Sequence, residues 1–124
     1  MIVEYEKRGR TAVITLNRPE ARNAVSGELA QALEEAIDKL EADDDVWVGI
    51  LAGNGPVFCA GADLKAVASG KANLGTSRGG FGGFVTLERT KPVIAAVEGP
   101  AVAGGCELVL AVSYTHLRAH ETLH

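Results

Sequence analysis

The spacing of apolar and polar residues predicts a β-hairpin at the start of the chain. Apolar and polar side chains alternate from Val3 to Lys7, as they do in a half-buried strand. Residues 11–16 are rich in β-formers, and Gly9-Arg10 between the two runs is a turn signal. Two antiparallel strands are therefore expected within the first sixteen residues.

A helix is predicted after this hairpin, beginning near Ser26. Pro19 disfavours helical angles at the residue before it, so residues 17–20 are expected to form a loop. Ser26 is a favourable N-cap, and Glu28 suits the positive end of the helix dipole. Five apolar residues then fall on one helical face: Leu29, Leu33, Ala36, Ile37 and Leu40. The three aspartates of residues 43–45 end the helix.

The remaining pattern alternates short strands and helices. Continuous apolar runs predict buried strands at residues 46–52 and 93–97. Short helices are predicted at three places: residues 63–68, 84–89 and 104–111. Residues 70–83 are rich in glycine and are predicted to form a mobile loop, either a plain one or a lid over a pocket. The order of hairpin, helix, strand, helix, helix, strand and helix predicts an α/β fold with crossovers.

Composition and charge narrow the class of protein. A chain of 124 residues is one domain or less, and its net charge of −4 argues against a nucleic-acid surface. It contains no apolar run of about 18 residues, so no membrane span is expected. Residues 1–4 lack the features of a signal peptide, and two cysteines, Cys59 and Cys106, make no disulfide framework. A cytoplasmic location is expected.

Candidate chemistry lies where two adjacent glycines, Gly104 and Gly105, precede Glu107 at a predicted helix start. Glycine allows a backbone N–H to approach a ligand, and a helix N-terminus adds unpaired N–H groups and a positive dipole end. A second glycine turn at residues 59–65 could supply another N–H. Two such donors could hold an oxyanion beside an acid/base.

Four motifs stand in order along the chain: LNRPEARNA at 16–24, FCAGADLK at 58–65, KPVIAAV at 91–97 and GPAVAGGCEL at 99–108. Together they resemble the crotonase superfamily of enoyl-CoA hydratases and isomerases, over about residues 3–111. The resemblance implies an α/β fold of the ClpP/crotonase type, a spiral of ββα units, present here as a truncated N-terminal half. It also implies an acyl-CoA substrate, no cofactor beyond the CoA of that substrate, and a parent that forms homotrimers or hexamers.

The resemblance also implies roles for individual residues. The N–H groups of Ala62 and Gly104 would hold the thioester oxygen, and Glu107 would be the catalytic acid/base. Substrate contacts are implied for nine residues: Arg22, Ala24, Ala60, Ala62, Asp63, Leu64, Lys65, Gly104 and Gly105. No metal site is implied. Hydratases of the family use a second glutamate about 20 residues after the first, and no counterpart is found here.

The residues by themselves leave structural alternatives open. Glu107 is also a favourable dipole partner, and glycine turns also serve tight geometry. Asp63 and Lys65 would then be a helix-capping residue and a solvated lysine, while Cys59 and Cys106 would be small buried fillers. The corresponding alternative function is a non-catalytic acyl-CoA-binding protein or a structural remnant.

The end of the chain differs in composition from the rest. All 15 glycines lie at or before Gly105, and all three histidines lie at His116, His120 and His124. We therefore expect a partial acyl-CoA-binding domain over 1–111 and a non-native tail over 112–124, which resembles translated sequencing-adaptor read-through. Such a fragment is expected to be inactive. The tail fits H-E-x-x-H, so a zinc hydrolase is the remaining alternative.

Overall fold

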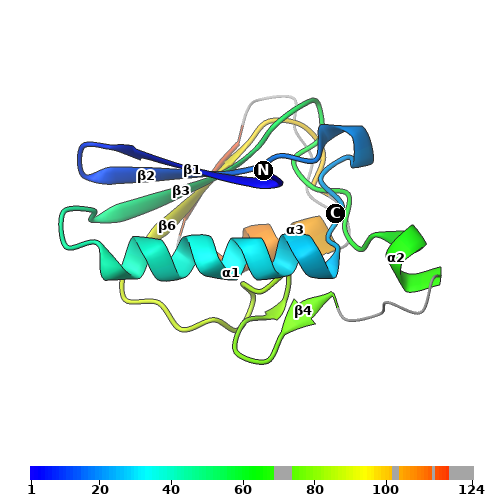
Figure 1. Cartoon of the computed structure of the whole chain (residues 1–124). Coiled ribbons are helices and arrows are strands. Elements are labelled where there is room, and N and C mark those ends of the chain that lie inside the picture. Colours follow the sequence, from blue (N-terminus) through cyan, green and yellow to red (C-terminus); the bar gives the residue numbers. More distant parts are fainter. Residues whose placement is uncertain (69–73, 102–103, 113, 118–124) are drawn as a thin grey trace.

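A five-stranded sheet organises the protein, in the order β1-β2-β3-β6-β7. The computed structural model describes residues 1–68, 74–101, 104–112 and 114–117. The strands are β1 (Val3–Arg8), β2 (Thr11–Leu16), β3 (Val48–Gly53), β6 (Val93–Val97) and β7 (Tyr114–Leu117). β1 and β2 form the predicted antiparallel hairpin, and the other neighbours are parallel. The predicted α/β class with crossovers is confirmed (Figure 1).

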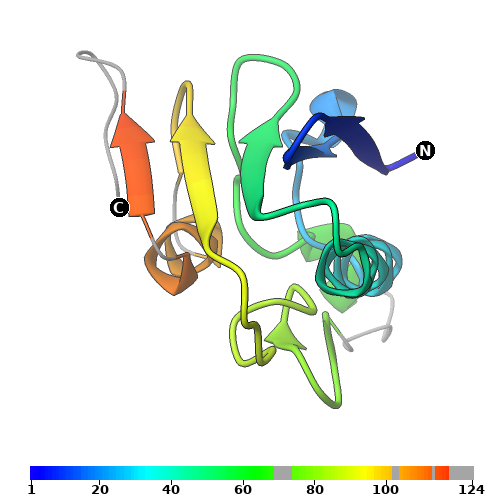
Figure 2. The same cartoon turned by 90° about the vertical axis from the view of Figure 1, so that its left-hand side faces the viewer.

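Helices connect the parallel strands. They are η1 (Pro19–Ala21), α1 (Gly27–Ala42), α2 (Leu64–Ala68) and α3 (Gly104–Ala111). In both views α1 and α3 lie on the same side of the sheet, whereas α2 stands apart from it (Figures 1 and 2). The loop between β3 and α2 and the connection from β6 to α3 lie where these parallel strands end. The predicted glycine turn at residues 59–65 runs from this loop into α2, and Gly104 and Gly105 are the first two residues of α3.

One face of the sheet is the core face. Alternate residues of β2 and β6 are fully or almost fully buried there: Ala12, Ile14, Leu16, Val93, Ala95 and Val97. They share one cluster with the predicted apolar face of α1, which is also buried: Leu29, Leu33, Ala36, Ile37 and Leu40. Val13, Ile50 and Ile94 are neighbours in register on the opposite face and are only half-buried.

The N-cap and the first-turn acidic residue predicted for α1 are confirmed. The Ser26 side chain accepts a hydrogen bond from the Leu29 N–H at 3.1 Å, and Glu28 lies in the first turn. The helix ends at Ala42, directly before the three aspartates. Because the cap fixes the first turn, the apolar face of α1 is aligned with the sheet.

The predictions for residues 70–89 are partly wrong. Residues 69–73 lie outside the described part, and the chain then forms a small hairpin of β4 (Gly75–Thr76) and β5 (Gly80–Phe81). This hairpin is fixed to α1, because the Thr76 hydroxyl donates to the buried Glu34 carboxylate at 2.8 Å. Residues 84–89 form turns and irregular chain instead of a helix. Phe84 and Leu87 are spaced as in a helix but are buried through tertiary packing.

The predicted tail, 112–124, contains the strand β7, which pairs with β6 from Ile94↔Tyr114 to Val97↔Leu117. Residues 118–124, with His120 and His124, lie outside the described part of the chain. The assignment of 112–124 as a non-native tail stays a prediction.

Candidate active site

Two chain segments that are far apart in sequence are joined side by side at the candidate site. Residues 22–25 follow η1, and residues 60–63 form the glycine turn before α2. The Ala60 N–H donates to the Arg22 carbonyl at 3.0 Å, and Val25 and Ala62 form a parallel bridge. Gly61, in the middle of the turn, has a φ of +95°, a conformation that favours glycine.

The direction of the Ala62 N–H follows from this bridge. The Val25 N–H donates to the Gly61 carbonyl at 2.7 Å, and the Asp63 N–H donates to the Val25 carbonyl at 2.8 Å. In a trans peptide the N–H points opposite to the preceding carbonyl, so the Ala62 N–H points away from Val25. Within the described residues no group accepts a hydrogen bond from it. In this peptide unit the Gly61 carbonyl thus belongs to the bridge and the Ala62 N–H does not.

The N-terminus of α3 lies against the same turn. A Cβ atom added to Gly105 would come 2.1 Å from the Cys59 carbonyl oxygen, so the two backbones are in direct contact. Cys59 also bridges to Ala101 at the end of the β6 connection. α3 begins at Gly104, and the first N–H groups of a helix have no partner within it. The two predicted glycine turns are thus neighbours in space.

The other predicted substrate contacts are distributed along these two segments. The side chains of Arg22 and Lys65 are exposed, whereas Ala24 is buried and Ala60 half-buried. Leu64 begins α2 and is 78% exposed. Glu107 is the fourth residue of α3, and its side chain lies outside the described part. The roles given to all these residues stay predictions.

Asp63 caps α2 and pairs with Arg18. One carboxylate oxygen accepts hydrogen bonds from the N–H groups of Lys65 and Ala66, at 3.0 and 3.2 Å. The other accepts from the Arg18 guanidinium at 3.0 Å, and both side chains are largely buried. The hydrogen bond from Arg18 and those from the helix N–H groups lower the pKa of Asp63. Its carboxylate therefore holds the turn in place.

We expect Asp63→Asn to lower the free energy of unfolding at neutral pH and to have no effect in acid. The folded-state pKa of Asp63 is depressed, so its contribution is complete above its unfolded pKa of about 3.9 and is lost as pH falls through the lower folded value. Urea unfolding of both chains at pH 7 and below about pH 3 measures this. The matched control is Asp44→Asn, at an exposed position. A difference between wild type and Asp63→Asn that persists in acid would contradict the ion-pair interpretation.

Asn23, which lies inside the first motif, has a role that was not predicted from the sequence. Asn23 is fully buried and adopts a left-handed φ of +54°. Its side-chain amide donates to the carbonyls of Asn54, Val57 and Phe58, at 2.9, 2.9 and 3.1 Å. An asparagine between charged and apolar residues gives no signal of such long-range contacts.

The prediction for Cys59 as a buried filler is confirmed. The side chain is fully buried and its thiol donates to the Asn23 carbonyl at 3.2 Å. Burial raises the pKa of the thiol, so the unreactive protonated form is favoured. The side chain of Cys106 lies outside the described part.

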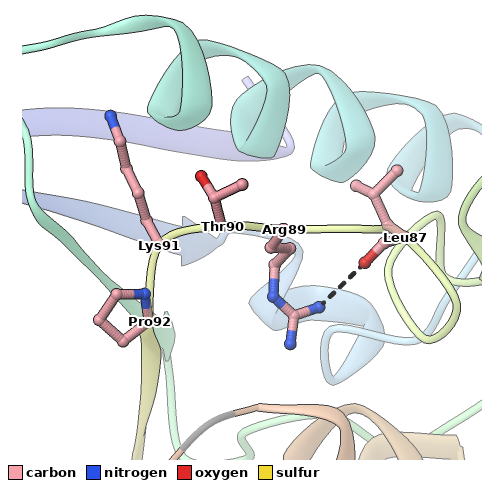
Figure 3. A pocket seen from close by; sticks show the side chains of 5 residues that line it. All are labelled: Leu87, Arg89, Thr90, Lys91 and Pro92. Atoms are coloured by element: carbon pink, nitrogen blue, oxygen red, sulfur yellow. Dashed lines mark hydrogen bonds between the residues drawn. The ribbon is translucent and has the colours of Figure 1, made fainter.

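A cavity of about 410 Å³ lies at the other end of β6, where that strand begins (Figure 3). Its lining residues are Leu87, Arg89, Thr90, Lys91 and Pro92. The Lys91 ammonium donates to the carbonyls of Leu40 and Asp43 at the end of α1. The Arg89 guanidinium donates to the Ala111 carbonyl at the end of α3. Both cations cap helices and do not belong to the candidate site.

Membrane spans and metal sites are both absent from the described residues. None of their helices is long and apolar enough to cross a membrane. No group of three or more metal-ligating side chains is found among them.

The family is established by comparison with known proteins. The family model for enoyl-CoA hydratase/isomerase matches residues 6–120. Since this is most of the chain, the protein belongs to the enoyl-CoA hydratase/isomerase family, within the crotonase superfamily.

Individual relatives agree with this assignment. The chain is 44% identical over 110 residues to the enoyl-CoA hydratase EchA19 of Mycobacterium tuberculosis, covering 84% of this chain and 41% of the relative. It is 40% identical over 112 residues to the short-chain-enoyl-CoA hydratase of Clostridium acetobutylicum, with 87% and 43% covered. A crystal structure of enoyl-CoA hydratase from Mycobacterium tuberculosis superposes with a TM-score of 0.86 at 47% identity, with 92% and 44% covered.

These comparisons confirm the predicted crotonase fold. The chain spans less than half the length of the relatives it matches. It therefore corresponds to the N-terminal portion of the fold.

Proposed function

We propose that the complete protein containing this segment is an enzyme that hydrates enoyl-CoA thioesters. The observation that carries the proposal is the pair of backbone donors, the Ala62 N–H and the N-terminus of α3, on two turns in direct contact. The Ala62 N–H is directed away from Val25 and has no acceptor among the described residues. Family membership and the names of the relatives supply the substrate class.

The proposed chemistry depends on charge at the thioester oxygen. When the oxygen of water bonds to the β-carbon, water gives up one proton and the electron pair of the double bond shifts toward the carbonyl, so negative charge develops on the thioester oxygen. A proton then adds at the α-carbon and removes this charge. Preorganised N–H donors stabilise this enolate-like oxygen, here those of Ala62 and Gly104. Glu107 is proposed to transfer the proton or to activate the water. These steps need no cofactor beyond the CoA moiety.

CoA is proposed to lie along the paired segments 22–25 and 60–65. The exposed cations of Arg22 and Lys65 support this proposal, because CoA carries phosphate groups.

Double-bond isomerisation is the related reaction that uses the same enolate. A role in fatty acid metabolism, assembly into homotrimers or hexamers, and a reducing cytoplasmic location are proposed with it. The free, buried Cys59 thiol is consistent with that location.

The decisive experiment is turnover by the complete protein, obtained by amplifying the locus beyond residue 111. We expect it to convert crotonyl-CoA to the 3-hydroxyacyl-CoA, measured as loss of the conjugated enoyl absorbance and by mass spectrometry. A 3-enoyl-CoA converted to the 2-enoyl-CoA without addition of water would identify an isomerase. Binding of acyl-CoA without turnover of either substrate would instead support the non-catalytic alternative.

A further inference from the structure

We infer that Asn23 is a positioning residue that sets the distance and direction between the two proposed oxyanion donors. The inference rests on the proposed function and adds to it a residue that does not itself touch the substrate. It starts from the strip of chain at residues 57–62, to which both donors belong or are attached. Ala62 lies on this strip, and Gly105 of α3 rests on it at the Cys59 carbonyl.

The buried side chain of Asn23 holds the first part of the strip. Its amide donates to the carbonyls of Val57 and Phe58, as well as to that of Asn54 in the preceding turn. Its Oδ1 atom accepts from the Arg18 N–H at 2.7 Å, so the amide plane cannot rotate freely. A Cβ atom added to Gly53 would lie 3.2 Å from Nδ2, so the Asn23 amide lies next to this glycine at the end of β3.

The end of the strip is held by a second side chain in the same network. The Arg18 guanidinium donates to the Ala24 carbonyl at 2.7 Å and to the Asp63 carboxylate at 3.0 Å. Asn23 therefore holds Val57 and Phe58 before the Cys59–Ala62 turn, and Arg18 holds Asp63, the residue directly after the strip. Without the Asn23 amide, the three carbonyls that share its two N–H hydrogens would lose this donor, and the strip would move to find other partners.

Displacement of the strip raises the free energy of the transition state more than it raises the free energy of the bound substrate. Both donors act on charge that develops during the reaction, so their displacement lowers kcat rather than raising KM. A misplacement of about 1 Å costs about 10²-fold in rate. Asn23 is thus expected to affect catalysis through geometry alone.

The test is Asn23→Asp in the complete protein. Aspartate keeps the shape, the tolerance for positive φ and an acceptor for the Arg18 backbone N–H, but it replaces the amide donors with a carboxylate oxygen that faces the same carbonyls. We expect kcat to fall about 10²-fold with KM changed less than about threefold. In difference infrared spectra, the stretch of a ¹³C-labelled thioester carbonyl in bound substrate should shift back toward its value in water. The matched control is Asn17→Asp, which loses only a bond to the exposed Met1 carbonyl and should leave both readouts unchanged.

A second variant covers the case that Asn23→Asp does not fold. Arg18→Lys is milder and weakens the other end of the strip; it should lower kcat about tenfold and move the carbonyl stretch in the same direction. The carbonyl stretch in the wild type distinguishes a failure of the proposed function from a failure of this inference alone. An unshifted carbonyl in the wild type contradicts the proposed function and this inference with it. If the wild-type carbonyl is shifted but the shift is the same in folded Asn23→Asp, only the role of Asn23 is contradicted. If Asn23→Asp does not fold, an unchanged shift in Arg18→Lys contradicts the network of Asn23 and Arg18 on which the inference depends.

Discussion

Replacing Glu107 by glutamine in the complete protein is expected to lower kcat for hydration of crotonyl-CoA by about 10²–10⁴-fold. Glutamine has the same shape and fills the same position, but it cannot transfer a proton at neutral pH. KM is expected to change little, because the proton transfer proposed for Glu107 takes place in the transition state and not in the bound substrate. Steady-state kinetics on the variant and the wild type measure both quantities.

The control must separate the loss of proton transfer from the loss of the favourable interaction between a carboxylate and the helix dipole. Glu107 is the fourth residue of α3, where a carboxylate also interacts favourably with the positive end of the helix. Glu28 occupies a comparable place in the first turn of α1 and is exposed. Glu28→Gln should therefore lose a similar electrostatic contribution, about 0.3–1 kcal/mol, while kcat stays the same. Unchanged turnover by Glu107→Gln would remove Glu107 from the mechanism.

The sequence was sufficient to predict those elements whose conformation depends on residues close to one another in the chain. The cap at Ser26 and the apolar spacing of α1 predicted both the helix and its buried face. The apolar run at 93–97 likewise became β6 with the predicted bounds. β3 begins at Val48, two residues after the predicted start, because its pairing with β2 begins at Thr11↔Val48, directly after the Gly9-Arg10 turn.

Long-range contacts explain what the sequence could not predict. The hairpin of β4 and β5 depends on Thr76 and Glu34, which are 42 residues apart. Asn23 reaches carbonyls more than 30 residues away. The side-chain partners of such a buried polar residue are set by the tertiary fold, and a single sequence carries no periodic signal for them.

The candidate site could be predicted from the sequence although it, too, depends on long-range contacts. Its proposed donors are backbone groups, and glycine turns at a strand end and a helix start are readable in sequence. The structure adds the contact between the two turns, through Gly105 and Cys59, and the direction of the Ala62 N–H. The two turns with their backbone donors could be predicted from the sequence. The tertiary fold is what places these turns in contact.

Gly105→Ala tests whether that contact matters and is expected to lower kcat by about 10²-fold or more in the complete protein. The added Cβ would lie 2.1 Å from the Cys59 oxygen, a backbone atom that cannot rotate away, so α3 and the turn must separate. The two donors would then no longer converge on one oxygen. We also expect a loss of about 1–3 kcal/mol in stability from the overpacking, measured by urea unfolding.

Gly9→Ala is the matched control for Gly105→Ala, because it makes the same substitution far from the candidate site. Gly9 has a φ of +61° and open space around its Cα, so alanine there costs about 1–2 kcal/mol of backbone strain without a clash. If kcat depended only on overall stability, the two variants would lose activity to a similar extent. We expect Gly9→Ala to keep wild-type kcat at a temperature where both variants are folded. Equal kcat in both variants would show that the Gly105–Cys59 contact has no part in catalysis.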